Sequence, residues 1–484
     1  MKSIARNYSY NLVYQIVQII VPVILTPYIA RVLGAEGSGR YSFSYSITSY
    51  FLLVAAFGFR YYAQRLVASH QGNQKQQSID FWELVIVRLI PAGISIIAYL
   101  FLVIWGFRDD ANQLLLFILT VDIIAVIFDI SFFFQGNEEF GKIVIRSCVV
   151  KVASVIMIMS FVKVPADLWL YTLIMVSASM ANVIALWPYV FRMITRIPLR
   201  DLHPFKHLKP ATVLFLPTIA ISVYTSLDKT MIGLITQSNV ENGNYEYADK
   251  IVKVVMTLVT SLGAVVIPRN SKHFANGELK PIQDNTRISV SFVFCLGIPL
   301  MFGLIAISDM IVPWFLGEGY DKTAVLIKIL APLVIIIGLS NLFGIQLLIP
   351  SKQDKKFTIS ITLGAACNFL LNLLLIKYIG CYGAAIASVI AELIITLLML
   401  FYVREYIQIS SLIFSSWKPL ISGLVMYVVC VMLKQKMQAT IINTVIVSLI
   451  GALIYVMLLF VLKDAFLQRT MYLIKSKMKK GAIK

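Results

Sequence analysis

The chain has 484 residues, of which 59% are hydrophobic and only 14% are charged. A water-soluble globular protein of this length carries far more charge, so the composition excludes that class. The net charge of +18 would suggest nucleic-acid binding in a soluble protein. Here most of the positive charge falls in short loops, where it orients membrane segments, so we expect no nucleic-acid partner.

Roughly fourteen apolar stretches of membrane-spanning length follow one another along the chain, so we predict an all-α polytopic membrane protein. The expected spans are 8–32, 42–64, 82–105, 112–134, 143–162, 166–191, 211–236, 246–268, 288–308, 323–350, 358–376, 381–403, 418–433 and 440–462.

The joints between these spans form two alternating sets. The set that includes both termini holds 27 Lys and Arg residues, and the other set holds 7. This bias predicts that both termini lie in the cytoplasm. The two longest joints, 192–210 and 269–287, are cytoplasmic and basic, and anionic lipid headgroups explain their charge. The short external loops argue against a membrane glycosyltransferase or polysaccharide polymerase, which needs a sizeable external catalytic loop.

Two parts of the sequence resemble each other. GRYSFSYSI begins at Gly39 and GNYEYADKI begins at Gly243, and each opens an even-numbered span. Gly58 and Gly263 follow at the same relative place, before a basic joint. The offset of about 205 residues corresponds to six spans and predicts parallel repeats, which place a substrate site between the two halves. We therefore expect two six-helix bundles, 1–200 and 201–405. Residues 406–484 would add two transmembrane helices and a basic cytoplasmic tail.

Eight cations fall inside the expected spans, in addition to Arg146 and Lys418 at cytoplasmic span ends, which are counted with the joints. The eight are Arg31, Arg60, Arg88, Lys151, Lys229, Lys250, Lys253 and Lys328. A charge in hydrocarbon is costly, so each must line a wet cavity, pair with an acid, or extend to the membrane surface. Arg31, Arg88 and Lys328 lie near span ends, where extension to the surface explains them. A cationic interior indicates an anionic cargo.

The candidate binding residues come from the deeper cations and from positions at the mouths of the spans. They are Arg60, Arg146, Lys151, Lys229, Lys250 and Lys253. Lys151 shares a helical face with Ser147 and Ser154. Asp228 and Lys229 are adjacent and point about 100° apart, so we expect them to meet partners on other helices. Lys250 and Lys253 lie at the outer end of their span, where extension to the surface is the alternative.

Three acids are candidates for coupling transport to an H⁺ or Na⁺ ion: Asp129, Asp228 and Glu392. Asp129 alternatively offsets the charge of Lys151 or Arg146, and the membrane potential alone is another possible driving force. The four histidines lie in cytoplasmic joints, so no metal site is expected within the spans. There is no P-loop, GxSxG, HExxH or CxxC motif, and we expect a transporter rather than an enzyme.

Five stretches resemble the Wzx-type polysaccharide flippases of the multidrug/oligosaccharidyl-lipid/polysaccharide exporter superfamily. They are PYIARVLGAEGSGRYSFSYSITSYF (27–51), FFFQGNEEFGKIVIR (132–146), LDKTMIGLI with NGNYEYADKI (227–251), WFLGEGY (314–320) and the segment from GIQLLIPSKQDKK to AAIASVIAE (344–392). The resemblance implies two six-helix bundles around a central cavity that opens alternately to the two sides. The implied cargo is an undecaprenyl-pyrophosphate-linked oligosaccharide, used for capsule, O-antigen or exopolysaccharide.

The same resemblance implies a place in the bacterial cytoplasmic membrane, with membrane lipids, a polysaccharide polymerase and a chain-length regulator as partners. Three alternatives stay open. A lipid II flippase or an exporter of cationic drugs would share the fold, although the drug exporter requires an acidic cavity. A membrane polysaccharide polymerase belongs to another class, and the short external loops argue against it.

Overall fold

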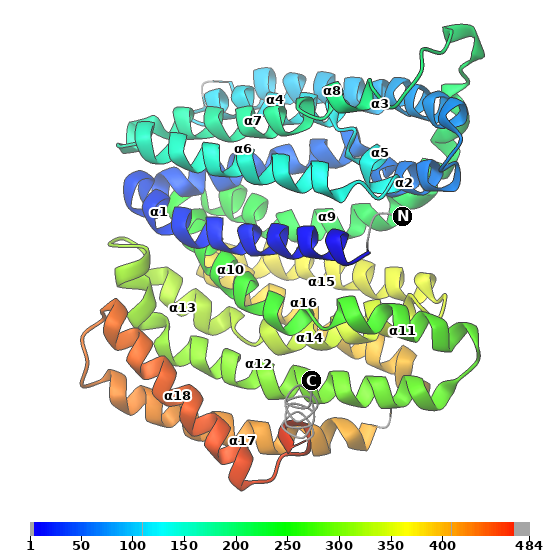
Figure 1. Ribbon diagram of the computed structural model, residues 1–484. Helices are drawn as coiled ribbons and strands as arrows, with labels where there is room; N and C mark the ends of the chain where they lie inside the picture. The colour runs from blue at the N-terminus through cyan, green and yellow to red at the C-terminus, as the bar shows by residue number, and fades with distance from the viewer. Residues whose placement is uncertain (1–3, 109, 408, 469–484) are drawn as a thin grey trace. The chain divides into compact units, whose positions relative to one another are not determined.

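The computed structural model describes residues 4–108, 110–407 and 409–468. The described chain consists of helices joined by short connections, and it divides into two units, Met1–Gly243 and Asn244–Lys484 (Figure 1). Eleven helices in the described ranges are long and apolar enough to cross a membrane. The predicted all-α, multi-pass membrane architecture is therefore confirmed.

The first unit is organised around α1 (Ile4–Ala56), which is kinked at Gly34 into two helical halves. It continues with α2 (Phe59–Ser69), α3 (Gln74–Phe101) with the π-helix η1 (Leu102–Gly106), α4 (Gln113–Phe128), α5 (Ser131–Gly136), α6 (Phe140–Phe161), η2 (Pro165–Asp167), α7 (Leu168–Ile184), α8 (Trp187–Val190), η3 (Leu199–Asp201), η4 (Pro204–His207) and α9 (Leu208–Thr236). Helices α3, α4, α6 and α9 all pack against α1.

The second unit contains most of α10 (Asn239–Thr260) and is organised around α12 (Leu279–Phe315). Its other elements are α11 (Gly263–Ala275), α13 (Asp321–Leu330), α14 (Leu333–Phe343), the π-helix η5 (Gly344–Leu348), α15 (Asp354–Ile379), α16 (Cys381–Val403), η6 (Arg404–Tyr406), α17 (Ile409–Lys434) and α18 (Ile441–Val461). Helices α14, α17 and α18 pack against α12, and α15 packs against α16.

The division between the units follows α9, whereas the boundary expected from the sequence at 200/201 precedes it. The reason is that α9 packs against α1 and α2. The three-part division of the chain stays a prediction. The basic tail expected at the C-terminus lies largely outside the described residues.

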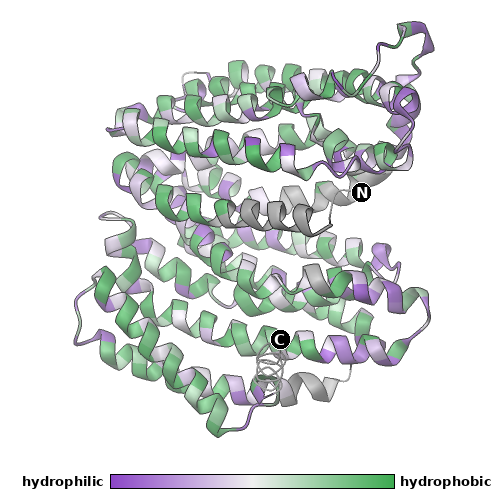
Figure 2. Ribbon diagram, viewed as in Figure 1, coloured by the Kyte–Doolittle hydropathy of each residue, from purple (hydrophilic) through white to green (hydrophobic). Residues whose placement is uncertain are grey.

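Helices cover all the expected spans, but they extend beyond several of them. The joint expected at 269–287 is mostly helical, because α11 runs to Ala275 and α12 begins at Leu279. The hydropathy pattern marks where a helix leaves the hydrocarbon, and a helix can continue past that point with polar residues. Figure 2 shows this pattern, with hydrophobic residues along the helices and hydrophilic residues gathered at helix ends and in loops.

The repeat predicted from the sequence is visible in matching helix breaks. In the first copy α1 ends at Ala56, and Gly58 adopts a left-handed conformation (φ 69°) before α2 begins. In the second copy α10 ends at Thr260, and α11 begins at Gly263. Glycine suits the first break because a side chain there would be strained by the positive φ. The aligned glycines thus mark the same interruption in both copies.

The first glycines of the two repeated motifs lie where α1 crosses the beginning of α10. A Cβ atom added to Gly39 would overlap the carbonyl oxygen of Asn239, and one added to Gly243 would overlap that of Ala35. The two backbones are therefore in direct contact. Small residues permit this close approach of helices, which is a common device in membrane proteins.

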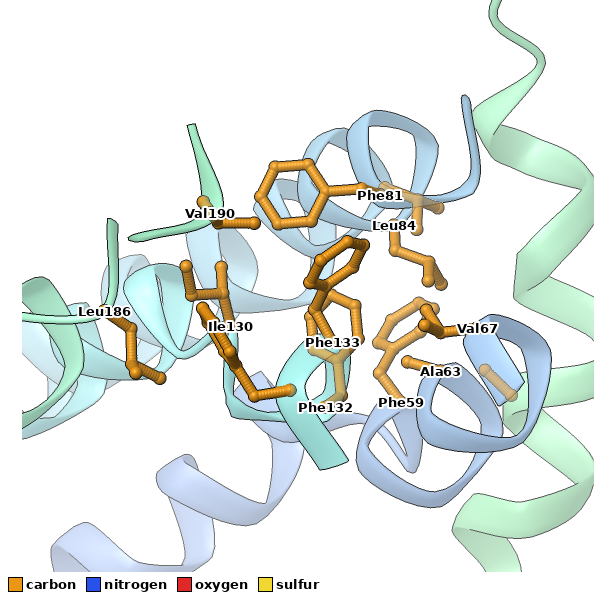
Figure 3. Close-up of a cluster of buried hydrophobic side chains, with 13 residues drawn as sticks. Phe59, Ala63, Val67, Phe81, Leu84, Ile130, Phe132, Phe133, Leu186 and Val190 are labelled. Atoms are coloured by element: carbon orange, nitrogen blue, oxygen red, sulfur yellow. The ribbon is translucent and has the colours of Figure 1, made fainter. Parts of the chain in front are cut away.

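One end of the first unit is held by an aromatic core. Phe59 of α2, Phe81 of α3, and Phe132 and Phe133 of α5 are all at most 2% exposed. Figure 3 shows these rings facing one another, with Val190 of α8 against the same cluster. We call this group the aromatic cluster. It joins α2, α3, α5 and α8 into one packed end of the unit.

Candidate functional site

The second half of α1 and the C-terminal half of α9 are joined by hydroxyl groups. Ser49 Oγ donates to Ser226 Oγ at 2.8 Å, and Tyr50 Oη lies 3.0 Å from Thr230 Oγ1. Thr230 Oγ1 also lies 2.8 Å from Ser46 Oγ. Residues three or four positions apart lie on the same face of a helix, so the hydroxyl groups of each helix share one face. The two faces meet along an antiparallel contact. We call these five residues the hydroxyl seam.

Asp228 and Lys229 lie within the α9 part of the hydroxyl seam. The carboxylate residue is 8% exposed, and the lysine is half-buried. The main-chain carbonyl of Lys229 accepts a hydrogen bond from Asn242 Nδ2 at 2.6 Å, which ties the end of α9 to the start of α10. A buried acid, an ammonium group and several hydroxyls therefore share one stretch of the contact between α1 and α9. Such polar groups inside a membrane protein are indicators of function.

Two predicted binding residues lie on α6, which also packs against α1. Arg146 lies at the contact with α7, where its neighbour Ser147 donates to Asn182 Oδ1 at 3.2 Å. Lys151 is half-buried, and Ser154 Oγ donates to its main-chain carbonyl at 2.8 Å. The expected common face of Ser147 and Ser154 is buried, at 9% and 8% exposure. The α6 cations therefore sit beside a small polar stripe.

Arg60 occupies the first turn of α2, just after the break at Gly58. Its side chain is exposed, and no ion-pair partner for it is found in the described part of the chain. Gly58 itself packs closely against the backbone of α9 at Ala211 and Phe215. The break thus places Arg60 beside the opposite end of α9 from the hydroxyl seam.

The predicted binding residues Lys250 and Lys253 belong to the second unit and are exposed on α10. Lys250 Nζ pairs with Glu246 Oε1 at 2.8 Å and lies 5.4 Å from the ring centroid of Tyr247. Lys253 Nζ pairs with Asp249 Oδ2, also at 2.8 Å. Each lysine is therefore compensated by an acid one turn earlier. The i,i+4 spacing in YEYADKIVK is the signal that could have identified these pairs from the sequence.

Asp129 ends α4 and takes part in a local backbone arrangement. Its Oδ1 accepts the main-chain N–H of Ser131, and its carbonyl accepts a hydrogen bond from Arg88. Arg88 also donates to the carbonyl of Val126 and is only 5% exposed. Extension to the membrane surface was therefore the wrong explanation for Arg88, because its guanidinium is buried at the break between α4 and α5.

The third candidate for ion coupling, Glu392, is half-buried on α16 of the second unit, and its carbonyl accepts a hydrogen bond from Thr396. On the neighbouring helix α15, Asn372 Nδ2 donates to Asn368 Oδ1 at 3.1 Å. Asn368 in turn lies 3.4 Å from Ser388 Oγ of α16. These amides join α15 to α16.

The sequence interpretation overlooked an acid that binds two lysines. Asp309 of α12 pairs through Oδ1 with Lys328 of α13 at 2.6 Å, and through Oδ2 with Lys434 of α17 at 2.7 Å. Lys328 therefore has an acidic partner, and surface extension alone does not account for it. Because the three residues come from distant parts of the sequence, no local spacing could have indicated this group.

Comparison with solved structures shows which known proteins have a similar fold. The structure is similar to that of the lipid II flippase MurJ, with a TM-score of 0.76 at 16% identity, covering 94% of this chain and 99% of that one. It is also similar to an inward-facing multidrug resistance MATE family transporter of the MOP superfamily, with a TM-score of 0.59 at 12% identity, covering 82% of this chain and 99% of the transporter. At these identities the likeness shows a shared fold.

The sequence has named relatives as well. A protein of Escherichia coli strain K12 named as an O-antigen transporter is 24% identical over 405 residues, which is 83% of this chain and 97% of the relative. The low-salt glycan biosynthesis flippase Agl15 of Haloferax volcanii is 27% identical over 190 residues, which is 38% of this chain and 39% of the relative. These names confirm the resemblance based on the five sequence stretches. A family model described as "Polysaccharide biosynthesis protein" matches residues 4–274, more than half of the sequence, and the chain therefore belongs to that family.

Proposed function

We propose that this protein is a flippase that moves an undecaprenyl-pyrophosphate-linked oligosaccharide from the inner to the outer leaflet of the bacterial cytoplasmic membrane. The cargo would serve assembly of capsule, O-antigen or exopolysaccharide. The observation that carries the proposal is the hydroxyl seam with Lys229, a polar site within the spanning helices of a polysaccharide biosynthesis protein.

The chemistry of the site suits such a cargo. A pyrophosphate concentrates negative charge, and an ammonium group in a region of low dielectric binds it strongly. The hydroxyls of the seam can donate to and accept from the hydroxyls of a sugar. The polyprenyl tail is as apolar as a lipid chain, so it has no need to leave the bilayer while the polar head crosses.

In the proposed cycle the two bundles alternate between states open to either side, and the pyrophosphate passes along the cations. Within the first unit Arg60, Arg146, Lys151 and Lys229 would form this path, and Lys250 and Lys253 would follow at the outer mouth. Because Glu246 and Asp249 compensate those two lysines, the cargo must displace an acid to bind there. Asp228, Asp129 or Glu392 would couple the cycle to H⁺ or Na⁺, unless the membrane potential drives it alone.

Replacing Lys229 tests the proposal directly. We expect Lys229→Ala to abolish surface polysaccharide and to leave lipid-linked oligosaccharide on the cytoplasmic side, because the half-buried cation of α9 is lost. The measurement is a quantitative assay of surface polymer and of lipid-linked units in a deletion strain that expresses each variant. Lys75→Ala, at an exposed position in the first turn of α3, is the matched control and should support normal polymer.

Normal surface polymer from a well-inserted Lys229→Ala protein would refute the role of this lysine. Retained function in Lys229→Arg would indicate that the charge is what matters. Loss of viability on gene deletion, in a strain that also lacks the first sugar transferase of its polysaccharide pathway, would instead point to a lipid II flippase. Export of cationic dyes by purified protein in vesicles would favour the drug exporter.

A further inference from the structure

The loop between α8 and α9, residues 191–207, is fastened along α3. Gln74 Nε2 donates to the carbonyl of Met193 at 3.0 Å, and the main-chain N–H of Thr195 donates to Ser78 Oγ at 2.9 Å. Further along, the main-chain N–H of His203 donates to Glu83 Oε1 at 2.7 Å. We call this segment the α8–α9 loop.

The last of these hydrogen bonds is made to a buried carboxylate. The Glu83 side chain is 0% exposed, and its Oε2 is 2.8 Å from His207 Nε2 and 2.7 Å from Lys206 Nζ. The other ring nitrogen of His207 lies 2.7 Å from Tyr62 Oη of α2. Met193 and Ile194 meanwhile pack against the aromatic cluster of Figure 3. The loop therefore has a defined course, held at both ends.

Despite these fastenings, the loop leaves large apolar side chains uncovered. Leu199 is 79% exposed, Phe205 is 67% exposed and Phe191 is 57% exposed. Between and beside them lie exposed basic residues, namely Arg192, Arg196, Arg200 and Lys209. The one acid of the loop is Asp201, whose Oδ1 lies 3.7 Å from Nε of Arg200. The hydrogen bonds to α3 fix the loop at Met193 and Thr195 before Leu199 and at His203 after it.

The loop begins where a membrane span ends. The candidate span Pro165–Val190 stops one residue before it. The fastening points on α3 run from Gln74 to Glu83, a distance of about 14 Å along the helix axis. In Figure 1 the segment between α8 and α9 projects from the end of its unit, and Figure 2 shows hydrophilic residues concentrated there.

We infer that the α8–α9 loop is a docking surface for anionic lipid headgroups, in which Leu199 and Phe205 enter the interfacial layer while Arg192, Arg196 and Arg200 bind phosphate groups. Alternating cations and large apolar side chains at the end of a span have the chemistry of an interfacial membrane anchor. The charge excess is complementary to the lipid surface. Because His207 directly precedes α9, docking would hold the start of that helix at a fixed depth.

A nitroxide placed at position 199 tests this inference in the full-length protein. The five native cysteines are replaced, Leu199→Cys is labelled, and the protein is reconstituted in phosphatidylcholine vesicles with or without about 30% phosphatidylglycerol. We expect the ratio of oxygen to nickel-complex collision rates at 199 to rise several-fold in the anionic vesicles. Adding Arg196→Glu and Arg200→Glu should reverse the rise, and so should about 0.5 M salt.

The matched control is Gln71→Cys, an exposed position in the polar turn between α2 and α3, which should report water in both vesicles. A label at 199 that stays as water-exposed as the label at 71 would overturn the inference and leave the surface to a protein partner. An equal depth in both kinds of vesicle would overturn it as well, because apolar insertion without headgroup recognition would then suffice. Persistence of the rise in the Arg196→Glu/Arg200→Glu variant would have the same consequence.

Discussion

Arg88 belongs to α3, is 5% exposed, and reaches the point where α4 ends before α5. A helix end leaves carbonyl groups without intrahelical partners, and inside a membrane no water is available to satisfy them. The guanidinium donates to two carbonyls at this helix end, those of Val126 and Asp129, and the carbonyl of Val126 also accepts the main-chain N–H of Asp129 at 3.3 Å. The charge of Arg88 within a span is thus explained by its hydrogen bonds to main-chain carbonyls. A bound anionic cargo is not required to account for it.

Arg88→Ala should destabilise the first unit, because the carbonyl of Asp129 loses the hydrogen bond from Arg88 and the carbonyl of Val126 loses one of its two donors. We expect a loss of about 3 kcal/mol, which would appear as a clear fall in the thermal midpoint of the detergent-solubilised protein. Arg88→Lys should restore only part of this stability, since one ammonium group lacks the planar fork of the guanidinium. An unchanged midpoint in Arg88→Ala would show that water or rearranged backbone satisfies the carbonyls.

The sequence allowed the cations within the expected spans to be identified, but it did not show which partner each of them has. Nothing near Arg88 in the sequence shows that α4 will end at Phe128. The hydrogen bonds from Arg88 to carbonyl groups at that helix end could therefore not be predicted. The partner of Lys328 was equally hidden, because Asp309 belongs to another helix. The pairs of Lys250 and Lys253 with acids one turn earlier were predictable, because their spacing is local.

At the scale of elements, the crossing of α1 and α10 depends on glycine. Gly243→Ala should push the two helices apart, because its new Cβ would meet the backbone of Ala35 and no flexible side chain could move aside. We expect destabilisation of about 2 kcal/mol or more, measured by thermal unfolding in detergent.

Gly93→Ala is the control for this substitution. Gly93 lies within α3, and a Cβ there would have open space around it. Alanine favours a helix over glycine by up to about 1 kcal/mol, so this variant should be neutral or slightly more stable. If both substitutions lowered stability equally, close helix packing would not be the reason for glycine at position 243.

The positions of the elements were largely predictable, because hydrophobic stretches of spanning length identify membrane helices from the sequence alone. The repeat aligned Gly58 with Gly263, but the expected spans 42–64 and 246–268 ran through these glycines, so the helix breaks there were not foreseen. The continuation of α11 and α12 through residues 269–287 was not foreseen. Those residues are polar, and hydropathy reports the environment of a segment rather than its backbone conformation.

At the scale of the whole molecule, the unequal distribution of Lys and Arg predicts which joints face the cytoplasm. A reporter active only in the cytoplasm should function when fused after Asn276, in the joint between α11 and α12. It should be silent when fused after Gln438, in the joint between α17 and α18. Alkaline phosphatase, which is active only outside, should give the opposite result at both positions. The reverse pattern would overturn the orientation deduced from the 27 and 7 cations of the two sets.

The contact between the repeated motifs has a symmetry that its individual distances do not reveal. Ala35 and Asn239 occupy equivalent positions in the two copies, as do Gly39 and Gly243. Gly39 meets Asn239, and Gly243 meets Ala35, so the glycine of each copy contacts the residue four positions before the glycine of the other copy. This reciprocal arrangement is what a two-fold axis produces between identical subunits. The segments 35–39 and 239–243 therefore contact each other as two protomers of a homodimer would, now joined in a single polypeptide.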